Sequence, residues 1–401
     1  MEPLIANCPE WLGELLTQSG GSVSFSQFMD WALNEKSNGA YATGRLRIGK
    51  NGDFVTSPSL GPEFAELLAV QIVDWFEQIQ NRSSIYLIDI GPGEGHLSRD
   101  LIRSIEKISP AWLKRIQLIL VEPNLGMVER QKATLKDLPI DNISWKSIKE
   151  LTENPVEGVI IAHEILDSLP VERLIFKDNQ LYQQGISLLE VEGKQYIKYV
   201  DLPITKELVY SIQEVCKSKN FTIPPAGIKD GWSTEWHNHL DNWFQEMNAI
   251  LKNGILLVID YTLESFRYYN TSRTSGTLVA YKQNTMSADI LNEPGNWDLT
   301  SHICLETVLF YAEKNQYESL GYVLQGQALL ALGLAQKIHS LQYFPNDKLS
   351  IALEKRESLL RLVDPSNLGR FYWMAFEKNI HFKSGLKTSK LESKFLNEPI
   401  N

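Results

Sequence analysis

The chain has 401 residues, of which 43% are hydrophobic and 22% are charged, a composition typical of globular proteins and unlike that of fibrous or disordered chains. Its 39 Lys and Arg residues against 49 Asp and Glu residues give a net charge of −10, which argues against a general nucleic-acid or anionic-membrane surface and favours a basic protein partner. No apolar run approaches the length of a membrane span, so we expect a soluble protein without membrane insertion.

The N-terminal composition and the cysteines indicate a reducing compartment. The first residues are acidic where a signal peptide is basic, and they lack the Arg-rich composition of a transit peptide. Cys8, Cys216 and Cys304 form no CxxC pair and are too few for a disulfide framework, so we interpret them as packing residues. These features predict a cytoplasmic protein.

Residues 1–80 are predicted to form a helical lid ahead of the core. Helical periodicity runs from about Pro9 to Gln80, with interruptions at 38–52 and 53–58. Within the second interruption, Thr56 and Pro58 are candidates to close over a bound ligand. The alternative is an ordinary N-cap before the next helix.

The core that follows, residues 81–330, alternates strand and helix. Apolar strands are predicted over 85–90, 116–121 and 159–162, with helices starting at about His96 and Gly126. Parallel strands need such crossover connections, so the pattern predicts an α/β protein with a Rossmann-like parallel sheet and helices on both faces. A ligand is then expected beyond the carboxyl ends of the strands.

After Pro170 the pattern changes to short runs separated by turn residues, which predicts an insertion of antiparallel hairpins at about 171–250. A later strand over 255–260 is expected to return to the main sheet. Residues 331–401 are predicted to form a C-terminal helical extension with a late strand over 371–376 and a loosely ordered tail after His381. The predicted hairpin strands are 174–177, 181–185, 188–191 and 196–200, and the helices beyond them are 206–217 and 234–251.

The loop after the first core strand indicates a bound cofactor. Gly91, Gly93 and Gly95 lie between that strand and a helix, where a sharp turn and a close ligand approach require glycine. The third glycine comes one residue too early for the GxGxxG fingerprint of nicotinamide sites, and no GxxxxGK[ST] phosphate loop is present. S-adenosyl-L-methionine is the remaining common ligand, and a plain tight turn is the structural alternative.

Two carboxylates support this interpretation. Asp89, two residues before Gly91, is placed to meet the cationic amino-acid end of such a ligand. Glu122 follows the second strand, where an acid can accept hydrogen bonds from both ribose hydroxyls. We therefore predict a cofactor site made of the three glycines, Asp89 and Glu122.

Several segments together resemble one family. The chain is similar to MidA-type methyltransferases, a family that includes a mitochondrial assembly factor which methylates an arginine of a respiratory complex I subunit. The resemblance implies a class I methyltransferase fold, S-adenosyl-L-methionine as methyl donor and a protein arginine as acceptor, during assembly of a respiratory or NAD(P)H dehydrogenase-like complex. The segments are Gly52 to Pro58, Asp89 to Gly95, Val121 to Pro123 and Glu164 to Pro170, with shorter matches at Ile259 to Tyr261, Gly276 to Leu278, Asp298 to Thr300 and Leu368 to Gly369.

The chain departs from this family at four positions outside the cofactor loop. His163 stands where Asn is usual, and Ser59 stands where Glu is usual. Thr262 replaces a usual Gly, and Asn284 replaces a usual His. Any effect of these changes is therefore expected on the acceptor or on activity itself.

Carboxylates after the third core strand are the candidates for acceptor chemistry. Glu164 and Asp167 could hold the planar, charged fork of a guanidinium and accept its proton during transfer. His163 could be a base or part of the wall. The plainer alternative is that Asp167 caps a turn and Glu164 is solvated. Asp260 and Tyr261 end another strand and rank below this pair.

No metal site is predicted. The group Glu235, His237, His239 and Asp241 invites a metal interpretation, but on a helix its members would share two different faces. Three other functions stay open: an assembly chaperone that has kept the fold without transfer, a small-molecule methyltransferase with a compact acceptor pocket, and, least favoured by the glycine spacing, a nicotinamide oxidoreductase.

Overall fold

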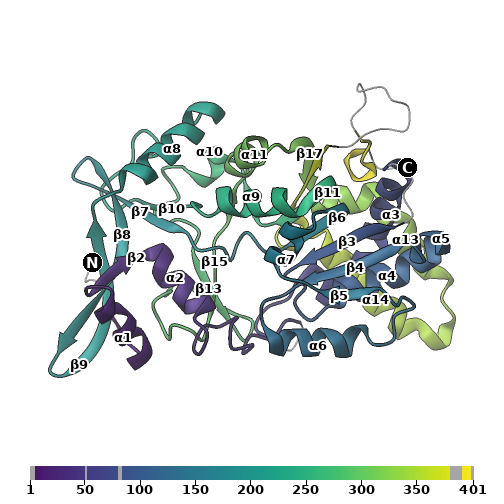
Figure 1. The fold of residues 1–401 in the computed structure, drawn as a ribbon, viewed down its shortest axis with the longest axis horizontal. Helices are drawn as coiled ribbons and strands as arrows, with labels where there is room; N and C mark the ends of the chain where they lie inside the picture. The colour runs from purple at the N-terminus through teal and green to yellow at the C-terminus, as the bar shows by residue number, and fades with distance from the viewer. Residues whose placement is uncertain (1–4, 50–51, 80–83, 380–390, 399–401) are drawn as a thin grey trace.

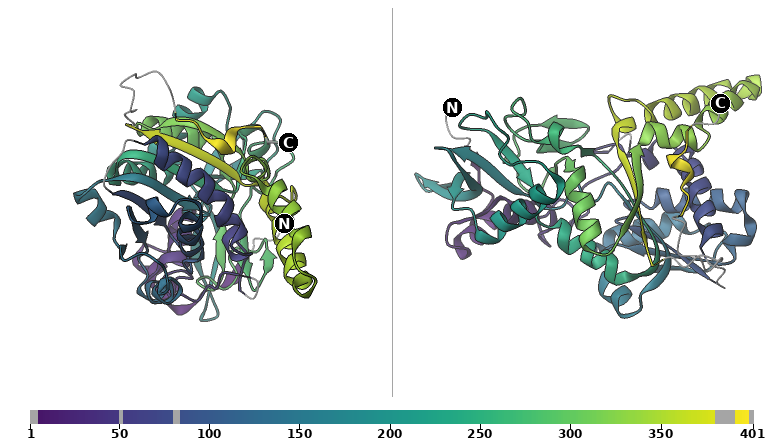
Figure 2. Two further views of the ribbon diagram at one scale, coloured as in Figure 1. Left: turned by 90° about the vertical axis from the view of Figure 1, so that its right-hand side faces the viewer. Right: turned by 90° about the horizontal axis from the view of Figure 1, so that it is seen from above.

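The computed structural model describes residues 5–49, 52–79, 84–379 and 391–398. Its main features are two sheets that lie side by side along the molecule, a seven-stranded sheet on the right of Figure 1 and a six-stranded sheet on the left. Figure 2 shows the same two parts from the side and from above. Within the described residues, no helix combines the length and apolarity that a membrane span needs.

The larger sheet confirms the predicted α/β core. Five neighbouring strands are parallel, and β18 runs antiparallel to both of its neighbours. The strand order reverses at β3: the next two strands, β4 and β5, are added on one side of β3, and the chain then returns to form β6 on the opposite side of β3. A reversal of this kind opens a crevice at the carboxyl ends of the strands. In spatial order the strands are β17 (Glu318–Leu324), β18 (Tyr372–Lys378), β11 (Leu251–Asp260), β6 (Val156–His163), β3 (Ile85–Ile90), β4 (Ile116–Val121) and β5 (Ile143–Trp145).

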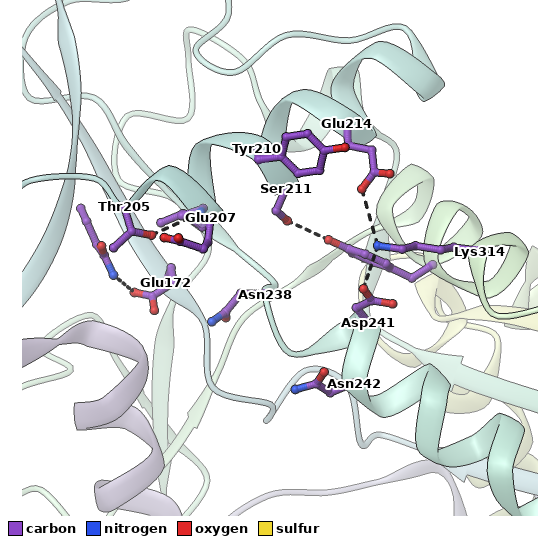
Figure 3. A pocket seen from close by; sticks show the side chains of 13 residues that line it. Glu172, Thr205, Glu207, Tyr210, Ser211, Glu214, Asn238, Asp241, Asn242 and Lys314 are labelled. Atoms are coloured by element: carbon purple, nitrogen blue, oxygen red, sulfur yellow. Dashed lines mark hydrogen bonds and ion pairs between the residues drawn. The ribbon is translucent and has the colours of Figure 1, made fainter.

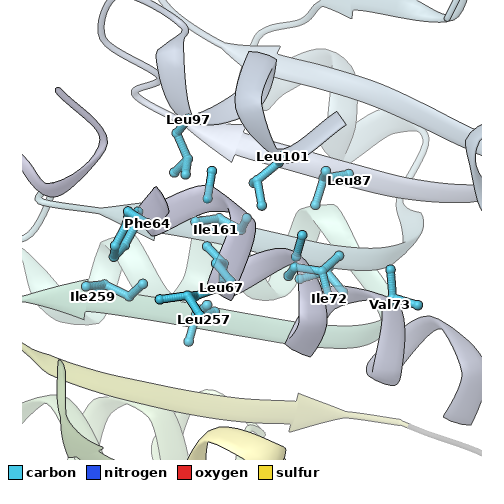
Figure 4. Packing of buried hydrophobic residues seen from close by; sticks show 14 of the residues in the cluster. Phe64, Leu67, Ile72, Val73, Leu87, Leu97, Leu101, Ile161, Leu257 and Ile259 are labelled. Carbon is cyan, nitrogen blue, oxygen red and sulfur yellow. The ribbon is translucent and has the colours of Figure 1, made fainter. Parts of the chain in front are cut away.

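Alternate residues of these strands enter two separate hydrophobic cores. Leu87, Ile161 and Leu257 pack on one face with the helix residues of α3 and α4 (Figure 4). Ile88 and Ile160 belong to the core on the opposite face. Both faces are therefore buried, which explains why the strand sequences are continuous apolar runs.

Helices cover both faces of this sheet. The helices whose residues join the first core are α3 (Glu63–Gln78), α4 (His96–Ile108), α5 (Pro110–Leu113), α12 (Gln325–Ala331), α13 (Leu334–Ser340) and α14 (Leu349–Leu362). Those whose residues join the second are α7 (Ile148–Glu153), α8 (Lys206–Lys219), α9 (Leu240–Ile250) and α11 (Leu305–Lys314). Leu135 at the end of α6 (Leu125–Leu135) also joins the first core.

The predicted hairpin insertion supplies four strands of the six-stranded antiparallel sheet, and the segment predicted to be a helical lid supplies the other two, at Ile5–Asn7 and Ser22–Ser24. One of the predicted hairpins also needs correction. The two strands predicted over 181–185 and 188–191 are a single strand, in which Ile186 pairs with Tyr199 and Ser187 pairs with Lys198. Gly185 lies inside the strand, where it pairs with Val200, and a Cβ there would overlap the carbonyl oxygen of Val23. The strands are β1 (Ile5–Asn7), β9 (Lys194–Leu202), β8 (Gln180–Val191), β7 (Glu172–Lys177), β10 (Ser233–Trp236) and β2 (Ser22–Ser24).

The start of the helix predicted over 234–251 is also wrong. Thr234 pairs with Leu174 and Trp236 pairs with Glu172 in β10, and α9 begins only at Leu240. Pairing with β7 buries this segment completely, which outweighs its helical periodicity.

The predicted lid is shared between the two halves of the molecule. Helices α1 (Glu10–Gln18) and α2 (Phe25–Asn34) pack with the six-stranded sheet, whereas α3 lies in the main core. The tail predicted to be loose after His381 is packed over 391–398, where Ser393 accepts a hydrogen bond from the indole of Trp75 at 3.1 Å. Residues 380–390 lie outside the described residues.

Short elements connect the two sheets. They are β12 (Thr262–Leu263) with β16 (Ile303–Cys304), the three-stranded group β13 (Val279–Lys282), β14 (Thr285–Ser287) and β15 (Asp298–Thr300), and the one-turn helix α10 (Ser265–Tyr268).

Candidate active site

The glycine loop follows β3 directly at the carboxyl edge of the sheet. Gly91, Gly93 and Gly95 have φ angles of 61°, 53° and 80°, in the left-handed region that favours glycine. Gly95 precedes the first residue of α4, whose N-terminal N–H groups face the loop end. A Cβ on Gly93 would lie 2.7 Å from Cδ1 of Ile48, and one on Gly91 would overlap Cδ1 of Ile165. The loop is therefore confined, and side chains at these two positions would collide with their neighbours.

The two predicted cofactor acids lie beside this loop. Asp89 is 3% exposed and accepts a hydrogen bond from Ser98 at 2.7 Å. The pKa of Asp89 is raised to about 7, mainly by burial and also by the nearby charge of Glu122. Glu122, at the end of β4, accepts a hydrogen bond from the backbone N–H of Asn124 at 2.9 Å. Among the described residues no cationic group acts on Asp89, so this buried carboxylate fits the amino-acid end of S-adenosyl-L-methionine, and Glu122 fits its ribose.

Gln131 is a site residue that the sequence analysis missed. Its side-chain Nε2 donates to the carbonyl oxygen of Gly93 at 2.8 Å and to the carboxylate of Glu122 at 3.2 Å. Its oxygen accepts a hydrogen bond from the indole of Trp145 at 2.8 Å. Only its position in the second turn of a helix facing the loop would have indicated this role.

The predicted closing residues lie in a tight turn. Thr56 precedes the 3-10 turn Ser57–Ser59, and its backbone N–H donates to Oγ of Ser59 at 3.0 Å. The backbone of Ser57 hydrogen-bonds to the carboxylate of Glu164. The structure therefore brings the turn that holds Thr56 and Pro58 against the predicted acceptor acid.

Glu164 and Asp167 lie on a turn that follows β6 and contacts the cofactor loop through Ile165. The carboxylate of Asp260 holds this turn, because it accepts hydrogen bonds from the backbone N–H groups of Ile165 at 3.1 Å and Leu166 at 2.8 Å. Glu164 has a φ of 55°, an uncommon conformation for a residue other than glycine. Asp260 is thus a structural member of the site and more than a turn residue.

Four carboxylates lie near one another in this part of the molecule: Glu164, Asp167, Asp260 and Asp298. Burial raises the pKa of Glu164 and of Asp167 well above the usual range, and the charge of Asp260 raises both further. Burial also raises the pKa of Asp298 to about 7 and that of Asp260 to about 6. Among the described residues, no lysine or arginine forms an ion pair with any of the four. The cluster therefore favours a cationic ligand.

His163 lies next to this cluster but is set in an aromatic wall. Its ring centroid is 5.3 Å from that of Phe64 and 6.4 Å from that of Phe371. Burial lowers the pKa of His163 to about 3, so the imidazole is neutral near neutral pH. Nε2 of His163 lies 3.4 Å from Oε1 of Glu164, and neither atom has a hydrogen-bond partner among the described residues. The buried Oε1 is free to accept a hydrogen bond from a ligand.

Three of the departures from the family pattern have structural contacts near the site. Thr262 donates a hydrogen bond from Oγ1 to the carbonyl oxygen of Asp260 at 3.3 Å. Asn284 donates from Nδ2 to the carbonyl oxygen of Gly52 at 2.9 Å, and Ser59 donates to that of Thr56 at 2.8 Å. These residues stabilise loops around the crevice.

The group considered for a metal is dispersed. Glu235 lies on β10, where its carboxylate accepts hydrogen bonds from Tyr268 and from Thr277, and His239 contacts Ser26. No cluster of His, Cys, Asp and Glu suited to a metal ion occurs in the described part of the chain.

A separate cavity of about 360 Å³ lies between α8, α9 and α11 (Figure 3). Most of the residues that line it carry polar groups, and Lys314 among them contacts Asp241 at 2.9 Å and Glu214 at 3.5 Å. None of the residues predicted to bind the cofactor or the acceptor lines it. The cavity is therefore distinct from the crevice at the strand ends.

Comparison with known proteins connects this geometry to one chemistry. Residues 67–323 match a family model described as "Putative S-adenosyl-L-methionine-dependent methyltransferase". The chain is 24% identical over 380 residues to the protein arginine methyltransferase NDUFAF7 homolog of Drosophila melanogaster, with 89% of this chain and 82% of that protein covered. It is 24% identical over 384 residues to the NDUFAF7 protein arginine methyltransferase of Bos taurus, with 89% and 80% covered.

A solved structure shows the same fold. A Burkholderia thailandensis protein crystallised with bound S-adenosyl-homocysteine superposes with a TM-score of 0.81 at 21% identity, over 97% of this chain and 94% of that chain. The predicted class I methyltransferase fold is confirmed by this similarity.

Proposed function

The chain belongs to a family of S-adenosyl-L-methionine-dependent methyltransferases, and on this premise we propose that it methylates an arginine of a protein acceptor. The curated relatives are protein arginine methyltransferases, which supports this choice of acceptor. We further propose that the acceptor belongs to a respiratory or NAD(P)H dehydrogenase-like complex under assembly, and that the reaction takes place in the cytoplasm.

One observation carries the proposal. The turn that holds Glu164 and Asp167 packs through Ile165 against Gly91 of the cofactor loop, so the acidic cluster adjoins the methyl-donor site. A guanidinium stays charged in proteins and offers a planar fork of N–H donors, which matches carboxylates that lack a basic partner. A neutral small molecule would gain little from this cluster.

The chain's own residues can be given roles in transfer. Asp89, Glu122 and the backbone of the glycine loop would hold S-adenosyl-L-methionine, which supplies an electrophilic methyl group when bound. Oε1 of Glu164 would accept a hydrogen bond from an N–H group of the guanidinium and thereby orient the attacking nitrogen. As the N–C bond forms, the displaced proton would pass to a neighbouring carboxylate, for which Asp167 and Glu164 are placed.

The raised pKa values of Glu164 and Asp167 favour their proposed role as proton acceptors. A carboxyl group whose pKa lies well above its ordinary value holds a proton more readily near neutral pH, so it is a better proton acceptor than an exposed acid. The cationic acceptor itself favours the ionised form before transfer. The neutral imidazole of His163 would form the wall of the acceptor pocket.

The proposal is tested by cofactor binding and methyl transfer in wild type and Glu164→Gln. We expect calorimetry to give the same S-adenosyl-L-methionine affinity for both proteins. With methyl-labelled cofactor and a panel of peptides that each contain a single arginine, we expect methylarginine after hydrolysis in wild type and a loss of at least about 100-fold in the variant.

Other results would select other functions. Cofactor binding without transfer to any acceptor would favour the chaperone hypothesis. Labelling of small molecules alone would favour a small-molecule methyltransferase. Equal transfer by Glu164→Gln would remove this residue from the mechanism.

A further inference from the structure

We propose that Tyr41 is a positioning residue of the acceptor site. Its hydroxyl orients the carboxylate of Asp298, while its backbone is held by residues next to the predicted cofactor site. The inference rests on the proposed function, since it concerns how one of the acceptor carboxylates is held. Neither residue binds the cofactor or carries the transferred proton in the mechanism above.

On the acceptor side, Tyr41 controls a buried carboxylate. Its hydroxyl donates to Oδ1 of Asp298 at 2.8 Å, and Asp298 is 2% exposed. No other hydrogen-bond donor to this carboxylate is found among the described residues. Because a carboxylate with a single partner can rotate, the tyrosine hydroxyl decides where its second oxygen points.

On the cofactor side, the backbone of the same residue is anchored. Nδ2 of Asn124 donates to the carbonyl oxygen of Tyr41 at 3.0 Å and to that of Ala42. The backbone N–H of Asn124 donates to Glu122, the acid predicted to hold the ribose. A few residues later, Ile48 lies over Gly93 of the cofactor loop. Tyr41 therefore joins the wall of the cofactor site to one acceptor acid.

The charges around Asp298 give this contact a measurable effect. Burial and the charge of Asp53 raise the pKa of Asp298 and the hydrogen bond from Tyr41 lowers it, and together they place this pKa at about 7. The remaining titratable groups that sense Asp298 are Glu164, Asp167 and Tyr281, which are acidic or neutral. Loss of the hydroxyl would leave Asp298 protonated to a higher pH, and a protonated carboxyl attracts a guanidinium less.

Ethylguanidinium serves as the probe, because it carries the acceptor group and does not depend on the identity of the acceptor protein. Its affinity is measured by calorimetry between pH about 6 and 9, a range that brackets the pKa of Asp298 at about 7, with the full-length protein saturated with S-adenosyl-homocysteine. For Tyr41→Phe we expect about tenfold weaker binding near pH 7, since a hydrogen bond to a charged group is lost. We expect the loss to shrink as pH rises, because the carboxylate then ionises without the donor. S-adenosyl-homocysteine affinity should be unchanged within about twofold.

Two further variants complete the experiment. Asn124→Ser keeps an oxygen that can cap α6 but removes the amide Nδ2 that donates to the carbonyl of Tyr41, so it should weaken ethylguanidinium binding in the same pH-dependent way. Tyr210→Phe, on a side chain that is 68% exposed, is the matched control and should behave as wild type.

The outcomes distinguish the proposed arginine acceptor from the proposed role of Tyr41. If wild type binds S-adenosyl-homocysteine but no ethylguanidinium, the arginine acceptor and this inference fall together. If wild type binds both ligands and Tyr41→Phe matches it at every pH, the inference alone is overturned. A loss in Tyr41→Phe that is equal at all pH values, or that extends to S-adenosyl-homocysteine, would show a general structural role and would also overturn it.

Discussion

The side-chain amide of Gln131 donates a hydrogen bond to the carbonyl oxygen of Gly93 at 2.8 Å. This contact links α6 to the middle of the cofactor loop, and a second one from the same nitrogen reaches Glu122. Gln131 is fully buried, so neither partner can be replaced by bulk water without a change in structure.

Gln131→Leu should therefore weaken cofactor binding. The change keeps the approximate volume but leaves the carbonyl of Gly93 and the indole N–H of Trp145 without partners, at a cost of about 1–3 kcal/mol in the free energy of unfolding. We expect S-adenosyl-homocysteine affinity to fall about tenfold by calorimetry, because the loop and Glu122 lose a shared restraint. Trp145→Phe removes only the hydrogen bond from the indole to the side-chain oxygen of Gln131, and it should leave S-adenosyl-homocysteine affinity unchanged. A loss of equal size in both variants would show that general destabilisation is responsible.

Gly93→Ala should remove cofactor binding almost completely. The φ of Gly93 is 53°, and a Cβ there would lie 2.7 Å from Cδ1 of Ile48, on the backbone that a ligand approaches. Gly193→Ala is the matched control, because its φ is 73° and nothing lies within 4 Å of the added Cβ. Each variant carries backbone strain of about 1 kcal/mol, which thermal unfolding measures. Full cofactor affinity in Gly93→Ala would place the ligand elsewhere.

The pH dependence of stability tests the buried carboxyl of Asp298. Its pKa is raised from 3.8 to about 7 in the folded protein, so between these values the folded state binds more protons than the unfolded state. The contribution of this group to stability is therefore full below about pH 4 and is lost as pH rises to about 7. Asp298→Asn imitates the protonated form and lacks this dependence.

We expect the melting temperature of Asp298→Asn minus that of wild type to increase between pH about 4 and 7 and then to level off, following the pKa of about 7. Taking the difference between the two melting temperatures removes the contributions of other groups that titrate in both proteins. Examples are His163 and His237, whose lowered pKa values change stability with pH in the opposite direction. A difference that is flat or that decreases with pH would contradict the assignment.

His163→Asn should alter stability more than the pH profile of transfer. The variant loses ring contacts with Phe64 and Phe371, which we expect to lower the free energy of unfolding by about 1 kcal/mol. Because the pKa of His163 is about 3, the imidazole does not titrate near neutral pH, and the profile of kcat should keep its shape. Disappearance of an ionisation near neutral pH in this variant would make His163 the base.

The local parts of the fold were predictable because their information is contiguous in the chain. The strand over 85–90, the glycine loop and the helix after it follow each other directly, and each one has a distinctive residue pattern. The strand over 116–121 has the bounds that its apolar run predicts, since a strand buried on both faces is apolar throughout. The acids at the ends of these strands could be located for the same reason.

The errors come from contacts with distant segments. Gly185 resembled a turn residue, but it lies inside a strand because β2 approaches it closely. Thr234 was assigned to a helix, and its pairing with Leu174 in β10 overrides that preference. The hydrophobic periodicity of neighbouring residues in the chain contains no information about β2, which pairs with Gly185, or about Leu174, which pairs with Thr234.

The sequence alone therefore determined the central strands and the glycine loop, and it located the two acids that are predicted to hold the cofactor, since turn geometry and strand burial depend on neighbouring residues. Only the tertiary structure decided the composition of the acceptor site. Asp298 meets Tyr41 across 257 positions of the chain, and Asp260 holds the turn of Glu164 from 94 and 95 positions away. Packing places these carboxylates together, with no basic partner among the residues that the structure describes, and that arrangement sets their raised pKa values and underlies the proposed cationic acceptor.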